Sequence, residues 1–161
     1  MSDIGQLSSI IGALLKERKQ TIAVAESSAG GLINAALVAV PGASAFYLGG
    51  GVIYTKIGRE MLMGIPREDV KGMRSASQPY AQLLARRVRE KLGATWGVSE
   101  TGASGPTGNS YGDAAGHACI AVSGPVDAVI TVETGSADRE ANMQEFTRRA
   151  LELLASCLQN K

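Results

Sequence analysis

A serine stands where an apolar segment gives way to two glycines. Residues 23–25 are Ala-Val-Ala, Glu26 follows, and Ser27 precedes the pair Gly30 and Gly31. This order predicts a strand, a tight turn and the start of a helix. A serine at such a junction projects toward the helix N-terminus, whose unpaired N–H groups can hold an oxyanion or a phosphate. Nucleophilic attack by Ser27 is therefore the first chemistry to consider, and a purely structural turn is the alternative.

A second loop with the means for chemistry follows the apolar segment 95–99. Residues 101–109 are Thr-Gly-Ala-Ser-Gly-Pro-Thr-Gly-Asn, too rich in glycine for regular structure. Loops at the carboxyl ends of strands carry the sites of many α/β proteins. Thr101 and Gly102 can offer hydroxyl and backbone donors to an oxyanion, whereas the alternative is a plain connector.

Three other titratable residues have structural interpretations. His117, the only histidine, lies inside a strand pattern, and we expect it to be structural rather than a base. Glu26 is expected to face away from Ser27 and to accept backbone N–H groups or pair with a cation. The direction of the Glu100 side chain, beside Thr101, is open in the same way.

The elements that must position these residues alternate along the chain. Apolar periodicity, with Ser77 and Asp138 as helix N-caps, predicts helices and strands in succession. Leu92 is placed on the buried face of its helix. The short connection 123–125 makes the last two strands an antiparallel hairpin. The expected fold is a single-domain, three-layer α/β structure with a mixed parallel and antiparallel sheet. The helices are expected at 4–19, 29–39, 57–63, 78–92 and 139–158, and the strands at 21–25, 49–55, 95–99, 117–122 and 126–132.

Bulk composition narrows the class of partner. The 161 residues are 45% hydrophobic and 19% charged, which suits one domain over 1–161. A net charge of +1 produces no electrostatic field strong enough to indicate binding of nucleic acid. Because no apolar run reaches the roughly 20 residues of a membrane span, we expect a cytoplasmic protein with a small-molecule ligand. One histidine and two separated cysteines, Cys119 and Cys157, provide no metal set, so neither metal nor cofactor is expected.

Five ordered motifs carry a resemblance to a known family. They are Ala-Glu-Ser-Ser-Ala-Gly-Gly at 25–31, Pro-Gly-Ala-Ser at 41–44, Val-Ile-Tyr at 52–54, Thr-Gly-Ala-Ser-Gly-Pro at 101–106 and Gly-Ser-Ala-Asp-Arg at 135–139. From about residue 5 to 158 the chain resembles the CinA C-terminal domain family. The resemblance implies an activity like that of nicotinamide-nucleotide amidases, which hydrolyse nicotinamide mononucleotide to the acid and ammonia by a metal-free Ser/Lys mechanism. A homo-oligomer is also expected.

The resemblance assigns roles to matching residues. It implies that Ser27 is the nucleophile, Ser44 its supporting serine, and Tyr54 and Thr101 catalytic partners, while Arg139 binds substrate. The glycines Gly30, Gly31 and Gly102 belong to the implied substrate-binding set. With its planar fork, Arg139 can grip a carboxylate or a phosphate.

The catalytic lysine of the family is missing. Arg59 stands where that lysine is expected, and arginine stays protonated in proteins, so it cannot act as a base. Lys56 lies three residues earlier, on the same face if the segment is helical, and is the candidate replacement base with Arg59 in the substrate-binding set. A solvated lysine at a helix start is the alternative. The second function in view is then a non-catalytic nucleotide-binding protein that has lost its base.

Overall fold

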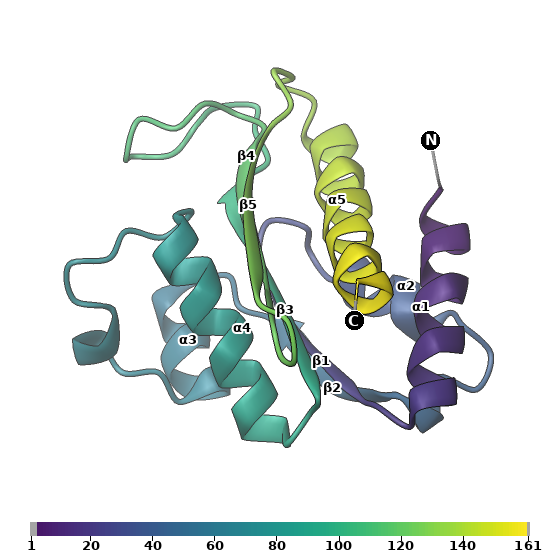
Figure 1. Cartoon of the computed structure of the whole chain (residues 1–161). Helices are drawn as coiled ribbons and strands as arrows, with labels where there is room; N and C mark the ends of the chain where they lie inside the picture. The colour runs from purple at the N-terminus through teal and green to yellow at the C-terminus, as the bar shows by residue number, and fades with distance from the viewer. Residues whose placement is uncertain (1–2, 161) are drawn as a thin grey trace.

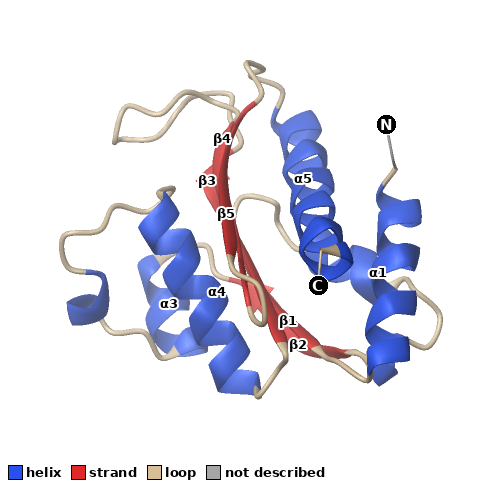
Figure 2. Cartoon of the chain, in the orientation of Figure 1, coloured by secondary structure: helices blue, strands red, loops and turns tan. Residues whose placement is uncertain are grey.

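A five-stranded mixed sheet forms the centre of the computed structural model, which describes residues 3–160 (Figures 1 and 2). The strand order is β2-β1-β3-β4-β5. β1 runs parallel to both β2 and β3, and the pairs β3–β4 and β4–β5 are antiparallel. The predicted α/β class and mixed sheet are confirmed. The strands are β1 (Ile22–Glu26), β2 (Tyr47–Val52), β3 (Trp96–Ala103), β4 (His117–Ser123) and β5 (Ala128–Glu133).

Helices cover both faces of this sheet (Figure 1). One face carries α1 (Ile4–Arg18), α2 (Leu32–Val38) and α5 (Arg139–Gln159), and the other carries α3 (Lys56–Met63) and α4 (Gln78–Leu92). Two short 3-10 helices, η1 (Ala43–Ala45) and η2 (Arg67–Val70), precede β2 and α4. The larger core lies under α1, α2 and α5, and a second core joins α3 and α4 to β1. The expected three layers are therefore present.

Polar side chains set where the helices begin. Ser77 and Asp138 cap α4 and α5 by accepting the N–H groups of Tyr80 and Ala141, as predicted. Thr55 caps α3 in the same way, so that helix begins at Lys56, one residue earlier than predicted.

Two predicted boundaries and the predicted burial of Leu92 were wrong for local reasons. α2 begins at Leu32 and not near residue 29, because Gly30 (φ 70°) and Gly31 (φ 101°) adopt left-handed conformations in the turn. The strand predicted at 49–55 lies at Tyr47–Val52, since the chain leaves the sheet to reach the Thr55 cap. Leu92 is 41% exposed because it is the last residue of α4, where the chain turns at Gly93.

β3 continues three residues into the segment predicted to be loop. Thr101, Gly102 and Ala103 pair with residues of β4, so backbone pairing overrides the glycine. A Cβ on Gly102 would lie 2.4 Å from the carbonyl oxygen of His117, so the close approach of β3 and β4 requires glycine here.

β2 forms one edge of the sheet and contains three consecutive glycines. Gly50 pairs with Val24 of β1, and a Cβ on it would lie only 1.9 Å from the Val24 carbonyl oxygen. The exposed side chains on this strand are those of Leu48 and Val52. Close contact between the first two strands therefore depends on Gly50.

Candidate active site

The turn after β1 places Ser27 at the carboxyl edge of the parallel strands. The carbonyl oxygen of Ser27 accepts the Gly30 N–H at 3.0 Å, closing the turn. Ser27 is partly exposed, and within residues 3–160 its hydroxyl forms no hydrogen bond. The neighbouring Ser28 is buried and its hydroxyl donates to Glu100. Of the two serines, only Ser27 has a free hydroxyl near the surface.

Glu26 fills the N-terminus of α2. Its carboxylate is fully buried and accepts the N–H groups of Gly31 at 2.9 Å, Ile33 at 3.2 Å and Asn34 at 2.8 Å. The Asn34 side-chain amide donates a fourth bond at 2.7 Å. The prediction that Glu26 satisfies backbone donors is confirmed.

Glu100, a residue of β3, forms hydrogen bonds with the residues that precede this helix N-terminus. It accepts the N–H groups of Ser27 at 3.0 Å and Ala29 at 2.8 Å, and its other oxygen accepts the Ser28 hydroxyl. Complete burial raises the pKa of Glu100 to about 7, against the lowering effect of these hydrogen bonds, and the charge of Glu26 adds to the rise.

These two carboxylates correct one expectation. The amides of the Ser27 turn and of the start of α2 were expected to be free for an oxyanion or a phosphate. Five of them, from Ser27, Ala29, Gly31, Ile33 and Asn34, instead donate to Glu26 or Glu100. The protein's own carboxylates therefore occupy this helix N-terminus, because buried acidic groups need several donors.

Tyr54, Lys56 and Arg139 lie at the same edge as Ser27. The last contact of the β2 segment with β1 is the bond from the Ile53 N–H to the Glu26 carbonyl oxygen at 2.6 Å, and Tyr54 and Lys56 follow it directly. Arg139, the first residue of α5, donates to the Tyr54 hydroxyl at 3.2 Å and to the Gly105 carbonyl oxygen. Both Tyr54 and Lys56 are exposed.

Arg59 is buried and occupied by structural contacts. Its Nε donates to the Ile65 carbonyl oxygen at 3.2 Å, and its Nη2 pairs with Glu60 at 3.2 Å. Burial raises the pKa of Tyr80, and the nearby Arg59 guanidinium opposes that rise. Although Arg59 and Lys56 belong to one helix, only Lys56 is exposed, so the two have different environments.

Thr101 is buried and supports a strained residue. Its hydroxyl oxygen accepts the N–H of Ala76 at 3.1 Å. Ala76 has a φ of 56°, in the left-handed region that L-residues rarely adopt, and its carbonyl oxygen lies 2.7 Å from Nε2 of His117. Thr101 therefore helps to fix the segment before α4.

Ser44 lies at the other end of the sheet. It belongs to η1, which precedes β2, and Ile22 at the start of β1 pairs with Tyr47 at the start of β2. Ser27 follows the opposite end of β1. Within one chain, Ser44 does not join the group around Ser27.

A charged network surrounds His117, which the sequence placed in a structural role. Its Nδ1 lies 2.5 Å from a Glu133 oxygen, and its Nε2 faces the Ala76 carbonyl oxygen and lies 3.6 Å from an Asp113 oxygen. Burial alone lowers the pKa of His117, but these acceptors and charges outweigh burial and raise it. Arg74 also pairs with Asp113, at 2.5 Å. With acceptors at both ring nitrogens, His117 is suited to hold a proton and not to remove one.

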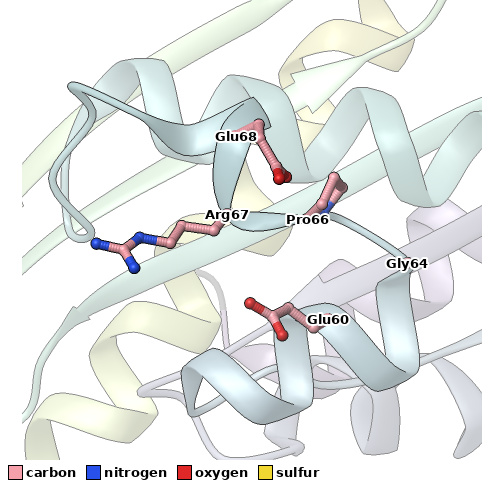
Figure 3. A pocket seen from close by; sticks show the side chains of 5 residues that line it. All are labelled: Glu60, Gly64, Pro66, Arg67 and Glu68. Atoms are coloured by element: carbon pink, nitrogen blue, oxygen red, sulfur yellow. The ribbon is translucent and has the colours of Figure 1, made fainter.

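Two adjoining pockets lie beside α3. The larger, of about 830 Å³, is bordered by Tyr54, Lys56, Arg59 and Tyr111, and by the basic residue Lys71. The smaller, of about 360 Å³, lies between the end of α3 and η2 (Figure 3). Both pockets are lined by Glu60, Arg67 and Glu68.

Two kinds of feature are absent from residues 3–160. No helix within 3–160 has the length and apolar character to cross a lipid bilayer. The same residues contain no group of three or more His, Cys, Asp or Glu side chains arranged to hold a metal ion.

Known proteins resemble this chain in sequence and in fold. Residues 4–158 match the model of the CinA C-terminal domain. A CinA-like protein of Chlorobium limicola is 37% identical over 150 residues, covering 90% of this chain and 35% of the relative. Another, from Prochlorococcus marinus, is 38% identical over 124 residues, covering 77% and 29%. The chain thus spans about a third of the length of these curated relatives.

Solved structures agree. The competence/damage inducible protein CihA of Agrobacterium tumefaciens has a TM-score of 0.87 at 27% identity, covering 99% of this chain and 97% of that one. A CinA superfamily protein of Enterobacter cloacae has the same fold, with a TM-score of 0.90 at 24% identity and coverages of 98% and 94%. On the family match and these relatives, the chain belongs to the CinA C-terminal domain family.

Proposed function

We propose that the protein hydrolyses the carboxamide of nicotinamide mononucleotide, giving nicotinic acid mononucleotide and ammonia, with Ser27 as nucleophile. The observation that carries this proposal is the contrast between two adjacent serines. Ser28 is buried and its hydroxyl is bound to Glu100, whereas Ser27 is partly exposed with a hydroxyl free of hydrogen bonds within residues 3–160. A serine nucleophile needs such a free hydroxyl beside a base.

Lys56 is the base in this proposal. Arg59 is permanently charged and committed to Ile65 and Glu60, whereas Lys56 is exposed at the first turn of α3. Neutral Lys56 removes the Ser27 proton as the oxygen attacks the carboxamide carbon. The same proton then passes to the leaving nitrogen, and ammonia departs from the acyl-enzyme. Water hydrolyses the ester and regenerates the Ser27 hydroxyl.

Cationic groups near this edge suit a nucleotide phosphate. The guanidinium of Arg139 donates hydrogen bonds to the Tyr54 hydroxyl and the Gly105 carbonyl oxygen, and these two bonds fix its position. The pocket of about 830 Å³ also carries Lys71 and Arg67, and Tyr54 and Tyr111 offer rings for an aromatic base. Cation and ring together favour a mononucleotide over an uncharged amide.

Purified protein, nicotinamide mononucleotide and an ammonia assay test the function directly. We expect turnover by the wild type and none by Ser27→Ala, with Ser9→Ala, at an exposed serine of α1, as the control. An active Ser27→Ala variant would exclude this nucleophile. A wild type that binds the nucleotide in calorimetry without turnover would instead establish the non-catalytic nucleotide-binding protein.

We also propose a homo-oligomer in the cytoplasm. The side chains of Ile57, Met61 and Leu62 on α3 are 74%, 78% and 59% exposed, an apolar surface beside the pocket. Light scattering after gel filtration tests the association, and a monomer at micromolar concentration would contradict it.

A further inference from the structure

The carboxylate of Glu100 contacts the first part of the Ser27 turn. Glu100 belongs to β3, next to β1 in parallel register, where Ala25 pairs with Ser99. It bonds three successive residues more than seventy positions away in sequence: the amides of Ser27 and Ala29 and the hydroxyl of Ser28. Of the two serine side chains in the turn, it leaves only that of Ser27 unbound.

Neighbouring contacts fix the remaining groups of the turn. The Ser104 hydroxyl donates to the Ser28 carbonyl oxygen at 2.8 Å, and the Asn142 side chain from α5 donates to the Ser104 carbonyl oxygen at 2.8 Å. Glu26 holds the next stretch of backbone through Gly31. The direction of the Ser27 hydroxyl therefore depends on backbone bonds, and two of these end on Glu100.

We propose that Glu100 is a positioning residue for the reaction at Ser27: its carboxylate holds the backbone that presents the Ser27 hydroxyl, and the hold weakens when the carboxylate takes up a proton. This inference rests on the proposed function.

The chemistry of the hydrogen bonds explains why the proton matters. Hydrogen bonds to a charged carboxylate are about twice as strong as bonds to a neutral acceptor. A protonated Glu100 must also donate from one oxygen, so the Ser28 hydroxyl has to turn from donor to acceptor. The ionisable group that acts on Glu100 across the turn is Glu26, and the groups that bond it are uncharged amides and a hydroxyl. Burial with a pKa of about 7 brings this change into the neutral range.

The first test follows the two amides by NMR as pH is varied. In the wild type, the Ser27 and Ala29 amide resonances should titrate together with a midpoint near 7. The titration should vanish in Glu100→Gln and persist in Glu17→Gln, a matched change at an exposed residue of α1. In Ser28→Ala the midpoint should rise, because a bond that favours the charged form is lost. Flat resonances, or a titration that survives in Glu100→Gln, would overturn the proposal.

The second test measures amidase kinetics. Glu100→Gln should lower kcat about 10- to 100-fold at alkaline pH with little change in KM, because a misplaced nucleophile loses orientation. The variant should also lose the part of the pH dependence of kcat that has its midpoint near 7, because glutamine does not ionise. If Glu100→Gln lowers the melting temperature together with kcat and keeps the wild-type pH profile, Glu100 has a structural role and the positioning proposal is contradicted. A wild type without amidase activity would overturn the function on which the proposal rests, while the amide titration still decides whether Glu100 holds the turn.

Discussion

A hydrogen bond of 3.2 Å joins the guanidinium of Arg139 to the hydroxyl of Tyr54, two residues 85 positions apart in the sequence. It ties the connection between β2 and α3 to the first turn of α5, and the further bond to Gly105 brings in the loop after β3. Three separate segments thus meet at one cation beside the Ser27 turn.

Arg139→Lys should weaken substrate binding. Lysine retains the charge but loses the planar fork that can hold Tyr54, Gly105 and a ligand anion together, so we expect KM to rise about tenfold. Since Arg139 is exposed, the melting temperature should change by no more than about 2 °C. Steady-state kinetics and calorimetry measure both quantities, and an unchanged KM would remove Arg139 from the binding site.

Lys56→Met and Arg59→Lys separate the roles of the two cations. Loss of a general base should reduce kcat by about 100-fold or more in Lys56→Met, with nucleotide binding retained. Arg59→Lys should add little activity and should cost about 1–3 kcal/mol of stability, because the buried carbonyl oxygen of Ile65 loses its donor. An active wild type indifferent to Lys56→Met would exclude Lys56 as the base, and a sharp gain of activity in Arg59→Lys would show that the base was missing.

Glu100 makes stability depend on pH. Its pKa rises from 4.5 in the unfolded chain to about 7 in the fold, so between these values the folded state binds more protons. Stability must therefore fall as pH increases through this window, by about 3 kcal/mol for this group. Urea unfolding at about pH 4 and about pH 8 should show this difference between wild type and Glu100→Gln. Parallel pH curves for the two proteins would contradict it.

His117 contributes stability in its protonated form. Because its pKa is raised in the fold, the contribution is complete below the unfolded value of 6.5 and is lost as pH rises through the folded value. His117→Gln should therefore destabilise the protein more at acidic than at alkaline pH. Chemical denaturation of both proteins on either side of neutrality measures this, and an equal loss at both would refute a role for the proton.

Chelation should leave amidase activity intact. The proposed steps use only Ser27, Lys56 and water. Activity is measured before and after prolonged treatment with EDTA, and loss that zinc restores would replace this mechanism by a metal-dependent one.

Strong local signals in the sequence were enough for the fold. Apolar periodicity and the caps at Ser77 and Asp138 located the helices, and the short connection 123–125 gave the final hairpin. The extension of β3 through Thr101 was missed because pairing with β4 is a long-range effect that glycine content does not report.

For the site, the sequence identified residue types better than their surroundings. Tyr54 and Arg139 were both proposed, and the structure brings them together, but Ser44 lies at the other end of the sheet. The sequence drew attention to Glu100 but did not reveal its role. An acidic residue directly after the apolar segment 95–99 nevertheless indicates a buried carboxylate that needs hydrogen-bond donors. Its hydrogen-bond partners in the Ser27 turn are brought close by the parallel pairing of β1 and β3, which no local sequence pattern encodes.

The glycines of β2 also affect the tendency of the protein to aggregate at high concentration. An exposed sheet edge is a template on which other chains can add strands, and long apolar edges promote aggregation. Gly50 cannot be replaced by a better strand former without a clash against Val24, and Gly49 and Gly51 beside it have low strand propensity. Gly50, which lets the two strands approach closely, and its two glycine neighbours thus also make this edge a poor template for fibril growth.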